Sequence, residues 1–291
     1  MAANQLSVGS KDVVQTSNFL ATQLGPDAPA AVRYASIVND NFPAPEARPG
    51  RERIFGPIRG GDRFTGDEHP ESYYCSAGFG AWDKGTMPSN GQPVLRYFMV
   101  TVGHCAYDQE RMRRRNRPGE GNKTQIIGLT ARRGYDNVKS TFDTDASAIR
   151  LEGNPRGLTP RYINMTGRPE IAIRGVVEPR VGMIVCQSGV TADDERCGKM
   201  IRLTVRIDYD NQRMLQVAYN AVARGGDSGA PVWQKGTQNF VGIVTAGSEN
   251  ADEEETAPSY FTPVRSPTGY PNMPGIFRSP EFASLHLLTA E

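Results

Sequence analysis

The chain has 291 residues, with 33 lysines and arginines against 32 aspartates and glutamates, so its formal net charge is only +1. This near balance gives no reason to expect a nucleic acid or a membrane surface as the partner. No apolar run approaches the roughly 18 residues that a membrane span needs. The length allows one large β domain or two modest ones, and we expect one main domain with extensions.

The first 57 residues differ from the rest of the chain. The segment KDVVQTSNFLATQL (11–24) places four apolar side chains on a loose helical face, namely those of Val14, Phe19, Leu20 and Leu24. The proline-rich NFPAPEARPGR follows. We therefore predict a helical arm and a linker in residues 1–57, which serve either as an inhibitory pro-segment or as packing. Residues 58–291 are predicted to form the main domain.

From about residue 58 onward, short segments rich in β-branched and aromatic residues alternate with turn residues. The segments predicted to be strands are 94–102, 146–151, 171–177, 182–186, 200–207, 213–222, 230–233 and 240–247. Because no long helical pattern separates them, the sequence predicts an all-β barrel or sandwich.

Two further segments complete this description of the chain. The basic run RMRRRNR (111–117) is interpreted as a solvated loop, with a docking patch as the alternative. The tail SPEFASLHLL predicts a closing helix that has Ser279 as its N-cap and Pro280 at its first position. Its inward-facing side chains would be Phe282, Leu285 and Leu288.

The cysteines and histidines do not form a metal-binding pattern. Four cysteines are present, and their spacing matches no C-x-x-C zinc motif. The three histidines are His69, His104 and His286, and none of them is grouped with a cysteine pair. We therefore expect neither a metal nor a cofactor.

Ser228 lies in the segment ARGGDSGAPVW (223–233), among three glycines. Glycine adopts positive φ freely, so this segment should turn sharply or lie open to a ligand. A serine hydroxyl becomes a good nucleophile only when a nearby base takes its proton. His104 is the best candidate base, because it directly follows a predicted strand and is flanked by Gly103 and Cys105.

A third residue would have to orient the imidazole of His104. Asp145 opens the apolar segment DASAIRL, and a carboxylate at the mouth of a strand could accept the imidazole N–H. Asp145 is our first choice. Asp143, two residues earlier, is the alternative.

At these positions the chain resembles the chymotrypsin-fold serine proteases. TVGHCA is similar to their T-A-G-H-C segment, DASAIRL to their Asp-x-Ala-Leu-Ile-x-Leu segment, and GGDSGAPV to their Gly-Asp-Ser-Gly-Gly-Pro segment. The bacterial streptogrisin and α-lytic type is the most similar, since CSAGFGAW and VGMIVCQSGVTADDERCGKM also resemble segments of that group. IRGGDRF (58–64) looks like the start of the mature domain.

The resemblance implies two packed six-stranded antiparallel β-barrels and a serine endopeptidase acting on protein or peptide substrates. It implies His104, Asp145 and Ser228 as the catalytic triad, and the amides of Gly226 and Ser228 as the oxyanion hole. It further implies the disulfides Cys75–Cys105 and Cys186–Cys197. Asp227 would pair with a free N-terminal amine or another partner, or would stabilise the turn as an Asx residue.

Resemblance also suggests which residues bind the substrate. They are Val222, Arg224, Gly225, Thr245, Ala246 and Gly247. No carboxylate is found where a trypsin-like pocket needs one, so we expect an apolar P1 residue rather than a basic one. The third disulfide of many relatives, near residues 222 and 246, is missing here.

Two other functions have to be weighed. One is an inactive protease-fold binding module, which the presence of all three triad residue types disfavours. The other is a serine esterase, whose Gly-x-Ser-x-Gly elbow between a strand and a helix is absent because Ser228 precedes a strand. Two disulfides indicate a secreted protein, although the first 30 residues show no signal peptide. A cytoplasmic location is the alternative.

Overall fold

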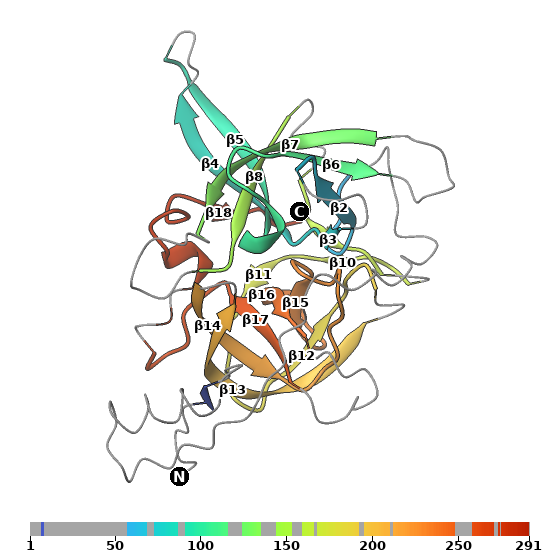
Figure 1. Ribbon diagram of the computed structural model, residues 1–291, viewed down its shortest axis with the longest axis vertical. Coiled ribbons are helices and arrows are strands. Elements are labelled where there is room, and N and C mark those ends of the chain that lie inside the picture. Colours follow the sequence, from blue (N-terminus) through green and yellow to red (C-terminus); the bar gives the residue numbers. More distant parts are fainter. Residues whose placement is uncertain are drawn as a thin grey trace.

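The computed structural model describes residues 7–8, 57–68, 73–86, 91–115, 124–134, 144–152, 159–165, 168–191, 195–209, 212–247, 258–270, 273 and 275–290. These residues form two β-barrels stacked one above the other (Figure 1). The helical arm predicted for residues 11–24 and the proline-rich linker lie outside the described residues, as do His69 and Asp143.

The first barrel is built from antiparallel strands in the first half of the chain. They are β2 (Arg63–Gly66), β3 (Cys75–Ser76), β4 (Phe79–Thr86), β5 (Pro93–Thr101), β6 (Arg111–Arg115), β7 (Thr124–Arg133) and β8 (Ser147–Leu151). The neighbours follow the order β4-β5-β8-β7-β6-β2-β3. Since β3 runs almost directly into β4, the chain itself closes the ring. Phe79, Phe98 and Met99 are fully buried in its core.

The second barrel closes by strand pairing. Its strands are β12 (Ile184–Gln187), β13 (Arg196–Tyr209), β14 (Gln212–Tyr219), β15 (Pro231–Gln234), β16 (Asn239–Ala246) and β17 (Ser259–Pro263). They follow the order β13-β12-β15-β16-β17-β14, and β14 pairs back with β13. This is a closed ring of six antiparallel strands. The predicted all-β fold of two antiparallel barrels is thereby confirmed; the second barrel has the six strands expected, and the first has six if the nearly continuous β3 and β4 are taken as one.

Short strands extend or connect the barrels. The strand β1 (Ser7–Val8) pairs in parallel with β13, and β11 (Gly175–Val176) pairs in parallel with β16. Between the barrels, β9 (Tyr162–Ile163) and β10 (Ile171–Ala172) form a small two-stranded sheet. No helix in the described ranges is long and apolar enough to cross a membrane.

Each predicted strand overlaps an observed one, but six barrel strands were not among the predicted segments, namely β2, β3, β4, β6, β7 and β17. The interpretation of the basic run as a solvated loop is wrong for Arg111–Arg115, which form β6. Met112 and Arg114 face the interior, and the Arg114 guanidinium donates to buried Asp62 at 3.2 Å. An ion pair thus allows an arginine to occupy an inward position that normally needs an apolar residue.

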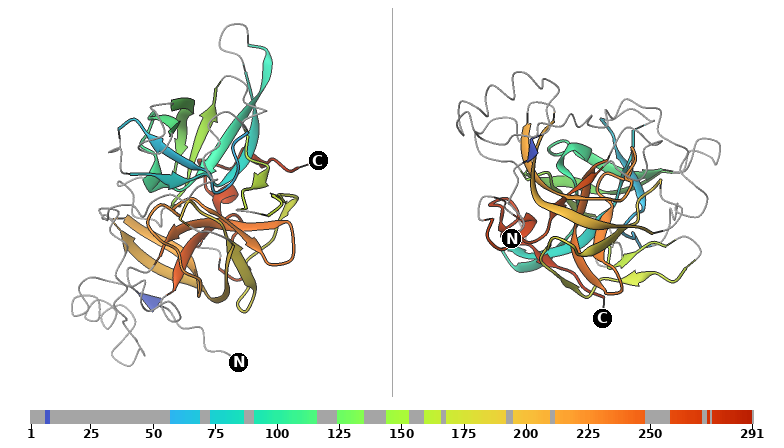
Figure 2. Two further views of the ribbon diagram at one scale, coloured as in Figure 1. Left: turned by 90° about the vertical axis from the view of Figure 1, so that its right-hand side faces the viewer. Right: turned by 90° about the horizontal axis from the view of Figure 1, so that it is seen from below.

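The predicted C-terminal helix is also wrong. A short 3₁₀ helix, η2 (Ile276–Arg278), leads into turns, and the strand β18 (His286–Leu287) then pairs with β4 of the first barrel. Figure 2 shows the C-terminal end at this barrel. Phe282 and Leu285 are buried as expected. One turn is enough to bury these two side chains. The backbone of the following residues then forms hydrogen bonds with β4, which it could not do within a helix.

Candidate active site

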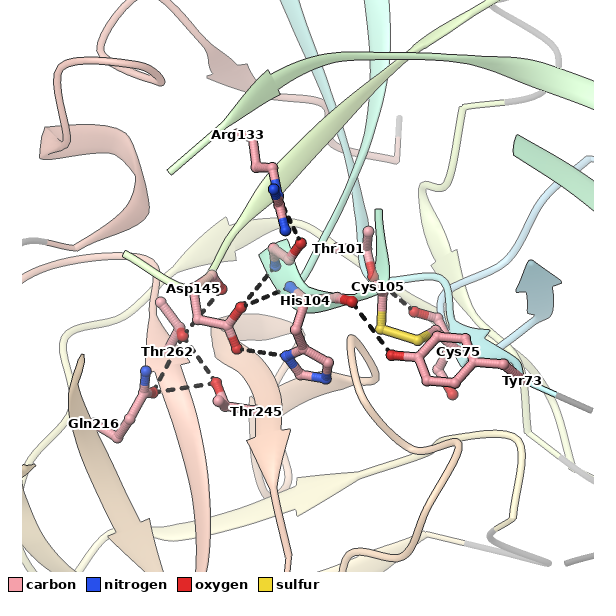
Figure 3. Close-up of polar contacts among 12 residues, drawn as sticks. Tyr73, Cys75, Thr101, His104, Cys105, Arg133, Asp145, Gln216, Thr245 and Thr262 are labelled. Carbon is pink, nitrogen blue, oxygen red and sulfur yellow. Dashed lines mark hydrogen bonds and ion pairs between the residues drawn. A yellow bond between two sulfur atoms is a disulfide. The ribbon is translucent and has the colours of Figure 1, made fainter. Parts of the chain in front are cut away.

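His104 lies in the 3₁₀ turn η1 (Gly103–Cys105), directly after β5. The disulfide Cys75–Cys105 ties this turn to β3. From the same segment, the Tyr73 hydroxyl donates to the backbone carbonyl of His104 at 3.2 Å (Figure 3). The backbone of His104 is therefore held by the disulfide at the neighbouring Cys105 and by the hydrogen bond to its own carbonyl.

Asp145 lies just before β8 and is fully buried. Its Oδ1 accepts hydrogen bonds from the backbone amides of Gly103 at 2.8 Å and His104 at 3.1 Å. Its Oδ2 lies 3.0 Å from His104 Nδ1. These contacts fix the imidazole so that its other nitrogen faces away from Asp145 (Figure 3). A carboxylate at Nδ1 favours the tautomer whose free Nε2 can accept a proton.

Ser228 lies in a turn of the segment that connects β14 to β15 of the second barrel. Its carbonyl accepts a hydrogen bond from the Ser76 amide at 2.8 Å, and the Thr101 hydroxyl donates to the Ser76 carbonyl at 3.1 Å. The serine turn is thus docked onto the strands that lead to His104. Within the described contacts, the Ser228 hydroxyl makes no hydrogen bond to the imidazole.

The turn at Gly226 needs a glycine for two reasons. Its φ is +94°, which is unfavourable for other residues, and an added Cβ would lie 2.5 Å from the Tyr74 ring. In the described part of the chain, the Gly226 and Ser228 amides donate to no protein acceptor. These are the two N–H groups that the sequence assigned to an oxyanion hole.

Asp227 has a partner that the sequence did not identify. The carboxylate accepts hydrogen bonds from the amides of Thr191 at 2.9 Å and Arg224 at 3.1 Å, and Arg196 Nη1 lies 3.5 Å from its Oδ2. The cation beside Asp227 is therefore an arginine of β13. The only hint in the sequence is that Arg196 directly precedes Cys197.

Both disulfides implied by the resemblance are confirmed. Cys186–Cys197 joins β12 to β13, where the two residues are direct cross-strand partners. Arg196 is the neighbour of Cys197, so this disulfide also holds the backbone of the arginine that pairs with Asp227.

Four of the residues expected to bind substrate are half-buried, namely Val222, Arg224, Gly225 and Ala246. The Val222 carbonyl accepts a hydrogen bond from Gln187 Nε2 at 2.8 Å. Gly247 packs against Ala223, since an added Cβ would lie 1.9 Å from the Ala223 carbonyl oxygen. The two segments are therefore adjacent.

Thr245 behaves differently from the other expected substrate-binding residues. It is 4% exposed, and its hydroxyl contacts Gln216 Oε1 at 3.2 Å and Thr262 Oγ1 at 2.9 Å. These contacts turn it toward a buried polar cluster on the Asp145 side (Figure 3). No sequence motif identifies Gln216 or Thr262 as part of the site.

Comparisons with known proteins show the family of the chain and its fold. The family model described as Trypsin matches residues 90–268, more than half of the chain. No curated protein sequence matches the chain.

Among solved structures, Protease A of Thermobifida fusca has a TM-score of 0.55 and 20% identity, covering 80% of this chain and 99% of that protein. The chymotrypsin of Cellulomonas bogoriensis has a TM-score of 0.55 and 19% identity, with coverage of 80% and 99%. The alpha-lytic protease homolog N4 has a TM-score of 0.52 and 21% identity, with coverage of 71% and 93%. At these identities the likeness shows the fold.

Proposed function

Since the chain belongs to the trypsin family of serine endopeptidases, we propose that it hydrolyses peptide bonds through an acyl-enzyme formed on Ser228. The observation that carries this proposal is the contact of 3.0 Å between His104 Nδ1 and the buried Asp145 carboxylate. This contact occupies Nδ1, so Nε2, on the opposite side of the ring, is the nitrogen that can act as the base. A histidine buried for structural reasons alone would not need a fully buried carboxylate at this nitrogen.

In this mechanism, Ser228 Oγ attacks the carbonyl carbon of the peptide bond while His104 Nε2 takes the hydroxyl proton. Asp145 stabilises the imidazolium that forms. The carbonyl oxygen becomes negatively charged and receives hydrogen bonds from the Gly226 and Ser228 amides, each typically worth about 2.7 to 4 kcal/mol. His104 then gives its proton to the leaving amine. Water attacks the acyl-enzyme by the same steps, which releases the carboxylic acid and frees Ser228.

A fluorophosphonate probe tests the proposal, because it reacts only with an activated serine. We expect labelling of the wild-type chain at Ser228, no labelling of Ser228→Ala, and cleavage of unstructured peptides by the wild type only. A folded protein that stays unlabelled, also after removal of residues 1–57, would instead be an inactive binding module. Labelling accompanied by hydrolysis of esters but not of peptides would indicate an esterase.

We propose that the acyl side of the substrate lies along Val222, Arg224, Gly225, Ala246 and Gly247, with Thr245 behind this wall. Support comes from the close packing of Gly247 on Ala223, which brings the two segments together. An apolar P1 residue is expected. Peptides that differ only at P1 test this, and faster cleavage after lysine or arginine than after leucine or phenylalanine would overturn it.

We further propose that residues 1–57 act as a pro-segment on the second barrel. The parallel pairing of Ser7–Val8 with Val205–Arg206 of β13 supports contact between this segment and the barrel. Removal of residues 1–57 should then raise the rate of probe labelling. An unchanged rate would leave these residues with a packing role.

The two disulfides support a secreted protein, since such bridges persist in oxidising compartments. Titration of thiols in the denatured, unreduced protein tests this proposal. Four free thiols would contradict it and would favour the cytoplasmic alternative.

A further inference from the structure

Three buried polar side chains from the second barrel meet behind Asp145. They are Gln216 on β14, Thr245 on β16 and Thr262 on β17 (Figure 3). Each is less than 5% exposed. Polar groups in such a place are costly unless they are hydrogen-bonded, so their contacts require an explanation.

The strand pairing explains how these side chains converge. Strand β17 lies between β14 and β16. The β16–β17 ladder has a bulge between Val244 and Ala246, so Thr245 is the extra residue there. A bulge redirects a side chain that regular alternation would point elsewhere. Here it brings the Thr245 hydroxyl to within 2.9 Å of the Thr262 hydroxyl.

The hydrogen bonds connect this cluster to Asp145. Thr262 Oγ1 donates to the Asp145 backbone carbonyl at 3.2 Å and lies 3.1 Å from Gln216 Oε1. Both oxygens are acceptors, so Thr262 shares its one hydroxyl proton between them, and among the described contacts it is the only member of the cluster in contact with the Asp145 carbonyl. The proton of Thr245 is then left for Gln216 Oε1 or Thr262 Oγ1. Thr262 is therefore the member that reaches Asp145, and the other two support it.

This bond crosses between the barrels. The carboxylate of Asp145 is held entirely by the first barrel, through Gly103 and His104. Its backbone carbonyl is held by the second barrel, which also carries Ser228. The position of the base relative to the nucleophile depends on how the two barrels dock, and Thr262 fixes that docking at Asp145 itself.

We propose that Thr262, oriented by Thr245 and Gln216, is a positioning residue for Asp145 and thereby for His104. This inference rests on the proposed function. Without the Thr262 hydroxyl, Asp145 shifts relative to Ser228, and the carboxylate stabilises the imidazolium less well. The loss should therefore affect the chemical step and the ionisation of His104, while substrate binding is retained.

Thr262→Val tests the proposal, because it removes the hydroxyl and keeps the shape of the side chain. We expect kcat to fall about 10- to 100-fold with KM within about twofold of wild type, and the rate of fluorophosphonate labelling to fall in parallel. The acid limb of the pH profile of kcat/KM should move to lower pH, since a less stabilised imidazolium has a lower pKa. Thr262→Ser keeps the hydroxyl and should restore most of the activity.

Thr144→Val is the matched control. Thr144 is buried, adjoins Asp145, and bonds to the Ser279 hydroxyl at 2.8 Å rather than to the second barrel. This variant should keep the wild-type kcat and pH profile even if its unfolding temperature falls. A Thr262→Val enzyme that behaves like Thr144→Val in both kinetic readouts would overturn the proposal.

Gln216→Met supplies an independent test should Thr262→Val fail to fold. We expect a smaller decrease in kcat, about three- to tenfold, with the same shift of the acid limb, and full activity with an unshifted acid limb would contradict the proposal. Where the double variant can be measured, it should be little worse than Thr262→Val alone, because both changes break one network. A wild-type protein that neither labels nor cleaves would refute the proposed function itself, whereas an active wild type with unaffected variants refutes only the positioning role.

Discussion

Arg196 on β13 places its Nη1 3.5 Å from Oδ2 of Asp227, the residue directly before Ser228. Arg196 also donates to the backbone carbonyls of Thr191 at 3.0 Å and Val222 at 3.3 Å. The guanidinium thus joins the turn of the nucleophile to the segment expected to bind substrate. Its partner in the turn is a carboxylate with no exposed surface.

Substitution Arg196→Met should therefore destabilise the protein and loosen the serine turn. Removing the cation leaves Asp227 buried with only two amide donors, which should lower the free energy of unfolding by roughly 1 to 3 kcal/mol. This is less than for a fully buried pair, because Arg196 is 20% exposed. Urea unfolding measures the loss, and the labelling rate should fall in the same variant. An unchanged labelling rate would mean that the ion pair does not support the turn.

Asp145→Asn tests the orientation of His104. The amide keeps the shape of the carboxylate, but its nitrogen cannot accept the imidazole N–H, so the wrong tautomer is favoured. We expect kcat to drop by about 10⁴ at neutral pH, with the fold retained. Steady-state kinetics measures the loss of kcat, and circular dichroism checks that the fold is retained. A loss below tenfold would point to another residue as the third member of the triad.

Gly226→Ala should disable the proposed oxyanion hole. The new Cβ would lie 2.5 Å from the Tyr74 ring, so the turn has to shift and carry its amides away from the substrate oxygen. The expected loss in kcat is about 10²- to 10³-fold.

Gly236→Ala is the control for this substitution. It imposes a similar positive φ of +74° in a surface turn where an added Cβ meets nothing within 4 Å. It should cost about 1 to 2 kcal/mol of stability and leave kcat intact. Equal kcat values for the two variants would contradict the assignment of Gly226.

The buried pair of Asp62 and Arg114 should give an unusual pH dependence of stability. Burial raises the pKa of the Asp62 carboxyl above its ordinary 3.8, although Arg114 opposes the shift. Above pH 3.8 the native state therefore holds this proton more tightly than the unfolded chain does. The free energy of unfolding consequently falls as the pH rises through the native pKa.

Urea unfolding of the wild type and Asp62→Asn at a series of pH values isolates this effect. The difference, wild type minus variant, should decrease as the pH rises through the window just above 3.8 and then become constant. A difference that grows with pH would mean that the attraction of Arg114 outweighs burial.

Local patterns were sufficient to locate much of this molecule. Ile201 to Ile207 alternate in polarity and form part of β13, as predicted. Arg111–Arg115 were missed as a strand, because this run is almost entirely charged. Arg113 and Arg114 pair with the two aspartates that flank β2, Asp67 and Asp62. The segment after Ser279 has a helical pattern, yet its backbone takes its hydrogen bonds from β4 instead. In both places, contacts distant in the sequence outweighed local preference.

The sequence by itself determined that the chain is all-β and which serine, histidine and carboxylate to consider, because strand alternation and short motifs are local properties. The resemblance of those motifs to a family implied the pairs Cys75–Cys105 and Cys186–Cys197, which the structure contains. Only the tertiary structure decided that Arg196 faces Asp227 and that Thr262 reaches across to Asp145. These partners come from different strands or different barrels. Their meeting depends on strand register, on a bulge and on the docking of two barrels, and no short stretch of sequence encodes those.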